Sequence, residues 1–214
     1  MNTKFLDFYK SASKSAYEKI AFNTFVNDLL RDKKTGSAKS RTVTALDMES
    51  KTPIRFIPSL FYTFLYITPK MQSLDKKDGF IDAVPLIFCT SNLGNKVAGI
   101  NFNMIPTDVR AAVIDTIVNT DEEFYKSASG EYQINEKLAK VLISKPSIFL
   151  SVIQDTTGYD ISSAFRQYNT EYIQNVRMIE YDQWEYIPFL VFKDDIRGIN
   201  LASMQKEMAV NNHR

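Results

Sequence analysis

The feature that most constrains the fold is an aromatic, β-branched run that lies between two prolines. Residues 60–67 read LFYTFLYI, with Pro58 two positions before the run and Pro69 two positions after it. Aromatic and β-branched side chains favour strands. Because the apolar residues are consecutive rather than alternating, we expect both faces of this strand to be buried. The run could instead be a stacking platform for single-stranded nucleic acid, but aromatic residues on both faces favour a core strand.

Further short segments that favour strands follow, separated by turns rich in Asn, Gly and Asp. Their apolar residues are too dense for a sheet with one solvated face, which predicts a small, strongly curved antiparallel sheet or barrel. The lone tryptophan, Trp184, is expected to be buried against the aromatic strand near Phe64. The further expected strands cover residues 80–90, 97–105, 176–181 and 184–192.

Apolar residues at helical spacing predict the helices that accompany the sheet. Thr107 is a good N-cap, and Asp108 favours the first turn of a helix over residues 107–118 that covers the sheet. The fold class that we predict is α+β: a small curved antiparallel sheet or barrel capped by helices, with an N-terminal helical extension. Further helical patterns cover residues 4–31, 136–143, 162–172 and 199–210.

The charge distribution suggests how the chain is organised. Residues 1–58 carry a net charge of +5 and residues 59–214 a net charge of −4, which gives +1 for the whole chain. We expect residues 1–50 to form a helical arm with a basic linker. Residues 51–198 are expected to form the α+β core domain, and residues 199–214 a C-terminal helix or tail.

One cysteine and one histidine exclude several classes of site. Cys89 cannot form an internal disulfide, and together with His213 it cannot supply a Cys/His zinc site. A Ser-His-Asp or Cys-His enzyme would need His213 as its base, and His213 lies in the expected C-terminal helix or tail, outside the core domain. We therefore expect no catalytic residues, no metal and no cofactor.

Two other sequence patterns resemble parts of chemical sites: a glycine spacing and two pairs of carboxylates. The Gly94–Gly99 spacing resembles a phosphate loop but lacks the Lys and Ser or Thr that such a loop needs. The carboxylate pairs Asp194–Asp195 and Asp182–Glu185 lie in turns beside strands, where acids are usually solvated.

Nothing in the sequence favours a membrane. The N-terminal segment lacks the apolar core of a signal peptide, and the longest apolar stretch, residues 54–67, is interrupted by polar residues and proline. We expect a soluble protein made in the cytoplasm, with Cys89 reduced and buried.

Two sets of residues are candidates for binding a partner. The basic stretch is most simply a solvated loop, with nucleic acid or an acidic protein as alternative partners; its cations are Arg31, Lys33, Lys34, Lys39 and Arg41. The N-terminal helical pattern carries aromatic side chains that must be buried, and we expect them to contact a neighbouring subunit; they are Phe5, Phe8, Tyr9, Tyr17, Phe22 and Phe25.

An ordered set of motifs, covering about half of the chain, resembles a family of small virion proteins from contractile-tailed phages of the T-even type. The family's pattern is an aromatic strand ending in Pro-Lys, an apolar strand with Pro-Leu, a Gly-hydrophobic-Asn strand ending in Pro before an Arg-bearing helix, and a late Glu-Trp strand. The matching segments are residues 60–66 (LFYTFLY), 69–70 (PK), 84–86 (VPL), 99–106 (GINFNMIP), Arg110, 166–168 (RQY), 176–177 (VR) and 182–185 (DQWE).

This resemblance implies a structural protein of the virion, made in the host cytoplasm. It would act as a tail, neck or baseplate adaptor through contacts with other virion proteins, as a homo- or hetero-oligomer. The alternative that the resemblance implies is a DNA-end-binding or DNA-end-protecting protein, for which the basic stretch would supply phosphate contacts.

Overall fold

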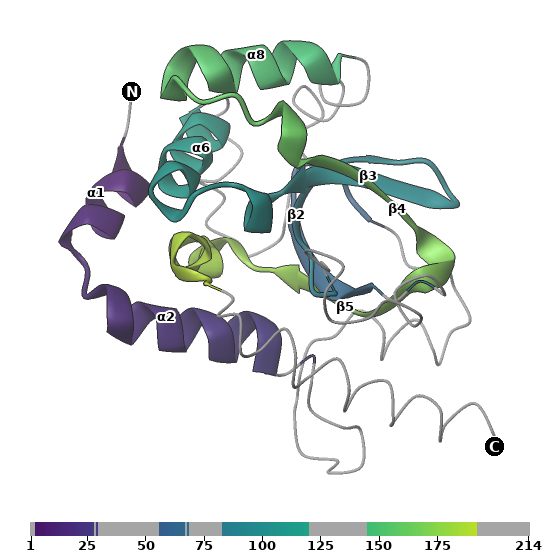
Figure 1. Ribbon diagram of the computed structural model, residues 1–214, viewed down its shortest axis with the longest axis horizontal. Helices are drawn as coiled ribbons and strands as arrows, with labels where there is room; N and C mark the ends of the chain where they lie inside the picture. The colour runs from purple at the N-terminus through teal and green to yellow at the C-terminus, as the bar shows by residue number, and fades with distance from the viewer. Residues whose placement is uncertain are drawn as a thin grey trace, which may run out of the picture.

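A five-stranded antiparallel sheet forms the centre of the molecule in the computed structural model (Figure 1), which describes residues 3–27, 29, 56–66, 68, 83–119 and 145–191. The strand order is β4-β3-β2-β1-β5, and the sheet is curled without closing into a barrel. The predicted α+β class is confirmed, with a curved sheet rather than a barrel. The strands are β1 (Phe61–Tyr66), β2 (Leu86–Asn92), β3 (Lys96–Asn101), β4 (Phe165–Asn169) and β5 (Ile173–Ile179).

The two edge strands, β4 and β5, follow one another in the chain and are joined only by the 3-10 turn η6 (Thr170–Tyr172). The sheet curls far enough for β1 to reach β4, although two strands lie between them. The rings of Tyr66 and Tyr168 are 4.9 Å apart, and the Tyr66 hydroxyl accepts a hydrogen bond from the Asn169 backbone N–H at 3.4 Å. Register shifts in β1 and β2 help to bend the strands, as bulges do.

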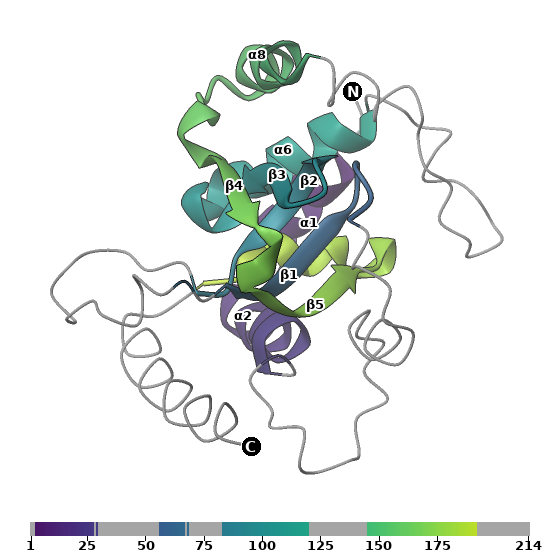
Figure 2. The same ribbon diagram turned by 90° about the vertical axis from the view of Figure 1, so that its right-hand side faces the viewer.

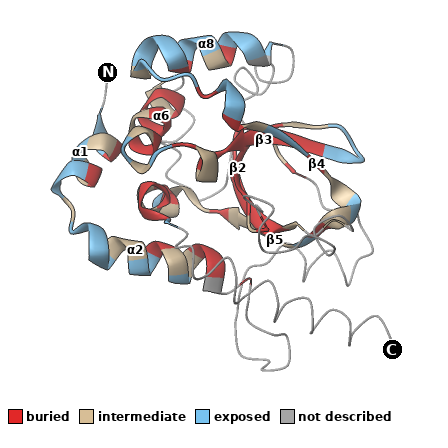
Figure 3. Ribbon diagram, in the orientation of Figure 1, coloured by how far each residue is buried: buried red, intermediate tan, exposed pale blue. Residues whose placement is uncertain are grey.

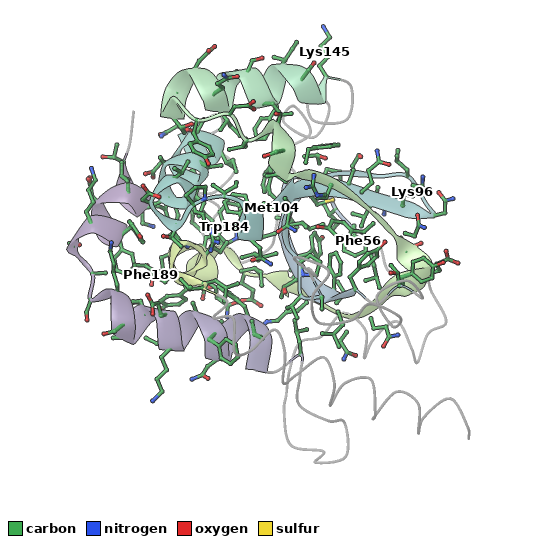
Figure 4. All side chains as sticks on the ribbon, in the orientation of Figure 1. Phe56, Lys96, Met104, Lys145, Trp184 and Phe189 are labelled. Atoms are coloured by element: carbon green, nitrogen blue, oxygen red, sulfur yellow. The ribbon has the colours of Figure 1, made fainter. Side chains whose placement is uncertain are left out.

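Strand β1 is buried on both faces, as its sequence predicts. One face contributes to a core that lies inside the curl of the sheet, where Figure 4 labels Phe56. The other face contributes to a core between the sheet and the helices. The curl core consists of Phe56, Leu60, Tyr62, Phe64, Ile87, Cys89, Val97, Tyr168, Ile173 and Val176.

Helices cover the outer face of the sheet, and Figure 3 shows their buried residues facing it. The expected helix after residue 106 is confirmed as α6 (Thr107–Asn119), which buries Val113, Ile114 and Ile117. The other helical elements are α1 (Lys4–Ser11), α2 (Lys14–Phe22), the π-helical turn η1 (Asn23–Asn27), α8 (Pro146–Thr157) and the 3-10 segments η3 (Phe102–Met104), η5 (Ser162–Ala164) and η7 (Tyr181–Phe189).

The N-terminal pattern forms two helices rather than one. Ala12 has an extended backbone with φ −79° and ψ 152°, so α1 ends there and α2 begins after Ser13. Both helices pack onto the same core as the sheet, with α1 against α6 and η7 and α2 against η7.

Placing the N-terminal aromatic residues at a subunit interface was wrong for the buried ones. Phe5, Tyr9 and Phe25 are buried in the core between the sheet and the helices, and Phe8, Tyr17 and Phe22 pack partly buried against it. In the fold, one face of the sheet is covered by helices, and α1 and α2 are part of that cover.

Two segments adopt different structures from those expected. Residues 162–172 form η5, β4 and η6 instead of a helix, because β4 pairs along its length with β3. Residues 184–192 were expected to be a strand, but η7 occupies residues 181–189, and the Trp184 indole N–H donates to the Ile179 carbonyl at 3.2 Å. Strand β3 also ends early, at Asn101, whose side chain accepts from the Asn103 N–H at 2.9 Å.

Trp184 is buried, as expected, but its aromatic partner is different. Its ring lies 4.8 Å from that of Phe61, in the core between the sheet and the helices. Phe64 belongs to the curl core. Alternate residues of a strand point to opposite faces, so positions 61 and 64 cannot share a neighbour on one side of the sheet.

Several expectations lie outside the described residues: the helices over 136–143 and 199–210, the basic stretch, and the domain boundaries at residues 50 and 198. Within the part of the chain that the structure describes, none of the helices has the length and hydropathy needed to cross a membrane.

Candidate interaction surface

Helix α8 is the element whose outward face stands out from an ordinary solvated surface. It begins at Pro146, a residue favoured in the first turn because the missing N–H costs nothing there. It ends at Gly158, which adopts φ 71° and donates its N–H to the Gln154 carbonyl at 2.8 Å. No helix is expected here from the sequence, whose helical patterns in this region cover residues 136–143 and 162–172.

The inward face of α8 is fixed by two buried side chains. Phe149 stacks on Phe88 of β2, with ring centroids 6.0 Å apart and an interplanar angle of 24°. Ile153, one turn further on, is fully buried in the same core. Figure 1 and Figure 2 both place α8 at the outside of the molecule, beyond α6, so its opposite face points away from the core.

The face directly opposite Phe149 and Ile153 carries the polar residues Ser147, Ser151 and Gln154, and the flank between that face and the core carries large apolar side chains. Ile148 is 48% exposed and Val152 is 41% exposed, and these positions are one helical turn apart. Tyr159, which follows the left-handed Gly158 after the end of the helix, is 39% exposed. We call the exposed residues Lys145, Ile148, Val152, Asp155 and Tyr159 the α8 stripe.

The composition of α8 makes the stripe unusual. Asp155 is the only charged residue within the helix, and the remaining exposed positions of the helix outside the stripe are Ser, Gln and Thr. Solvated helix faces normally carry many charged residues. Depletion of charge together with apolar and aromatic side chains is instead typical of the centre of a protein–protein interface.

Of the carboxylates singled out in the sequence, the structure describes Asp182 and Glu185. Asp182 is exposed and Glu185 is half-buried, both on η7. A hydrogen bond to Glu185 raises the pKa of the neighbouring Tyr186 phenol, with a smaller contribution from burial. Asp194, Asp195 and the five cations of the basic stretch lie outside the described residues. Among the residues that are described, no group of three His, Cys, Asp or Glu could hold a metal ion.

Two buried ionisable side chains, Arg110 and Asp115, hydrogen-bond to backbone groups of other elements. The Arg110 guanidinium donates to the Ile105 carbonyl at 2.8 Å and to the Leu190 carbonyl, and burial lowers the pKa of Arg110 to about 10. Asp115 accepts hydrogen bonds from the first turn of α1. Cys89 is buried as expected, and desolvation raises the pKa of its thiol to about 12, which keeps it in the unreactive thiol form.

Comparison with known proteins does not add to this description. No family model, no curated protein and no solved structure matches the chain. The resemblance to phage virion proteins therefore stays a prediction that depends on the sequence motifs alone.

Proposed function

We propose that this protein is a structural component of a tailed-bacteriophage virion, acting as a tail, neck or baseplate adaptor by binding other virion proteins. The observation that carries the proposal is the α8 stripe: Ile148 and Val152 expose large apolar side chains on a helix with one charged residue, and Tyr159 is exposed just after it. A surface of this composition gains free energy when a protein partner covers it. The sequence motifs supply the context of the particle.

The position of the stripe also suits an adaptor. The inward face of α8 is held by Phe149 and Ile153 in the core, so the helix can present the stripe without rearranging. A surface that is already organised in the free protein loses less conformational entropy when it binds.

The first experiment asks whether the chain is part of the particle. Virions of the phage that encodes it are purified through a density gradient and washed in about 1 M salt, which screens exposed charges beyond roughly 3 Å and so removes loosely bound proteins. The washed particles are analysed by quantitative mass spectrometry. A structural component should remain at a constant copy number per particle. Its loss from washed particles would contradict the proposal.

A second function, binding the end of the packaged DNA, is favoured by one sequence observation. Five cations lie between residues 31 and 41, and phosphate contacts from such a stretch give affinity that falls steeply with salt. Titration of a fluorescent duplex at several salt concentrations tests it. Replacing the five cations with glutamine should flatten the salt dependence if the stretch contacts DNA, and should change nothing if it is only solvated.

A further inference from the structure

We propose that two copies of this chain associate through the α8 stripe, with the two helices packed antiparallel across a twofold axis. This inference rests on the proposed function, because it names a partner for the same surface.

Four of the five residues of the α8 stripe, all except Tyr159, are symmetric about one position. Ile148 and Val152 each lie two residues from position 150, and Lys145 and Asp155 each lie five residues from it. In a twofold pair of antiparallel helices, the numbers of two facing residues have a constant sum. One register, with the axis at the level of residue 150, therefore places Ile148 against Val152 of the second copy and Lys145 beside Asp155 of the second copy.

Ile148, Val152 and Asp155 share one face of α8, because their spacings of four and three residues follow the helical repeat, and all three are exposed. Lys145 is the exposed N-cap residue immediately before the helix. Figure 4 shows Lys145 at the beginning of the helix, pointing away from the body of the molecule. Ser151 lies beside the apolar pair and is small, which allows a second helix to approach closely.

The charges of the stripe are badly placed within one chain. Lys145 lies at the positive N-terminal end of the helix dipole, and Asp155 lies in the last turn, at the negative end. The two residues are ten positions apart, roughly 15 Å along a helix, so they cannot pair with each other in the same chain. An antiparallel second copy corrects both defects, because each charge then lies beside the opposite charge and the opposite end of a dipole.

A parallel arrangement fails on the same residues. It would bring Lys145 beside Lys145 of the second copy and Asp155 beside its own equivalent, and the two helix dipoles would also repel. Charge complementarity therefore selects the antiparallel pair.

The size of the surface sets the expected strength. A 12-residue helix is about 18 Å long, so the pair buries much less than the roughly 1,600 Å² of a standard interface. We expect a dissociation constant on the order of 100 μM for the isolated chain, which corresponds to a binding free energy typical of weak contacts. Neighbouring copies held in a particle would experience a far higher effective concentration.

The test uses charge reversal in the full-length chain, followed by sedimentation equilibrium. Lys145→Asp and Asp155→Lys each bring like charges together twice across the axis, so each variant alone should dimerise about tenfold more weakly than the unmodified chain. An equimolar mixture of the two variants should recover the dimer, because in the mixed pair each substituted position faces its opposite charge. The double variant in one chain should recover it as well.

Matched controls separate pairing from folding. Gln154→Glu changes the charge of α8 at an exposed position outside the stripe and should leave the dissociation constant unchanged. Circular dichroism and thermal melting confirm that each variant is folded. Ile148→Glu should abolish association without altering the melt.

Any one of three results would overturn the inference. The first is a chain that stays monomeric up to about 1 mM, tenfold above the expected dissociation constant. The others are a dimer that is insensitive to either charge reversal, and a mixture of the two variants that associates no better than each variant alone. If the chain is monomeric but substitutions in the α8 stripe still remove it from particles, self-association is wrong and the proposed function stands. If it dimerises as described but is absent from virions, the proposed function fails and the dimer remains.

Discussion

The Asp115 carboxylate of α6 accepts a hydrogen bond from the backbone N–H of Phe5, at 3.0 Å, across 110 residues of sequence. Its second oxygen accepts from the N–H of Leu6 at 2.9 Å. These N–H groups belong to the first turn of α1, where no residue of the helix itself can accept from them. Asp115 therefore caps α1 from another helix and fixes the N-terminal segment onto the core.

Removing this cap should destabilise the fold. Asp115→Ala leaves two N–H groups at a buried helix end without their acceptor, at a cost of about 1–3 kcal/mol. Asp115→Asn keeps one amide oxygen as an acceptor and should lose less. Urea denaturation of the two variants measures the difference, and an alanine variant as stable as the unmodified protein would show that α1 does not need the cap.

The same carboxylate should give the fold a pH dependence. Burial raises the pKa of Asp115 above its ordinary value of 3.8, an effect strengthened by Asp7 and opposed by the two backbone hydrogen bonds and by Lys4. A raised pKa means that the folded state binds the proton more tightly. The contribution to stability is therefore complete below pH 3.8 and is lost as pH rises through the folded-state pKa.

Comparison with Asp115→Asn isolates this contribution, because the variant cannot titrate there. The free energy of unfolding of the unmodified protein, minus that of the variant, should fall as pH rises above about 4. Tyr181 also faces Asp115 electrostatically but titrates far above this range. A difference that rises with pH in this window would show that the hydrogen bonds outweigh burial.

The contact between Trp184 and Phe61 should be a major source of stability. Trp184→Ala removes the largest fully buried side chain and should cost about 3–5 kcal/mol. A double-mutant cycle with Phe61→Leu measures the ring–ring coupling, which is expected to be about 0.5–1.5 kcal/mol for an edge-to-face pair. A coupling free energy of zero would indicate that the two rings are not in contact in solution.

Gly99 in β3 has no room for a side chain. A Cβ there would lie 2.5 Å from the Phe88 carbonyl oxygen of the paired strand β2. Gly99→Ala should therefore separate the two strands locally and cost about 1–3 kcal/mol. Ala98→Gly, at the neighbouring buried position, removes a methyl group without a clash and serves as the comparison; equal losses would argue against the close approach.

Cys89 should be unreactive until the protein unfolds. The thiol is buried and its pKa is raised to about 12, so almost no thiolate forms at neutral pH. Reaction with a disulfide reagent should be slow in buffer and immediate in denaturant. Rapid labelling of the native protein would contradict the position of Cys89 in the curl core.

The sequence could predict the elements whose local pattern and tertiary role agree. β1 follows from its aromatic run, and α6 follows from its cap and apolar face. β4 could not be predicted, because Phe165, Tyr168 and Tyr172 mimic helical spacing and only pairing with β3 reveals the strand. The 3-10 segment η7 could not be predicted either, because its residues favour a strand by composition, while the Trp184 indole N–H donates to the Ile179 carbonyl at 3.2 Å and the ring lies in the core.

The candidate surface was harder to predict than the fold. Pro146 can end one helix or begin another, and the choice decides whether α8 exists. Nothing in the residues themselves says that Phe149 points to Phe88 while Ile148 points to solvent; that division depends on where the sheet lies. The burial of the N-terminal aromatic side chains was equally hard to predict, because their partners in η7 and α6 are more than ninety residues away in the chain.

The most direct test of the proposed virion role compares three forms of the chain during infection by the phage to which the proposal assigns it. The unmodified chain, the α8-stripe variant Ile148→Glu/Val152→Glu and the control Gln154→Glu are supplied in equal amounts, and their copy numbers in purified particles are measured by mass spectrometry. If the α8 stripe binds other virion proteins, the stripe variant should fold with an unchanged melting temperature and be lost from particles, while the control is incorporated normally. Incorporation of the folded stripe variant at the level of the control would contradict the proposed role.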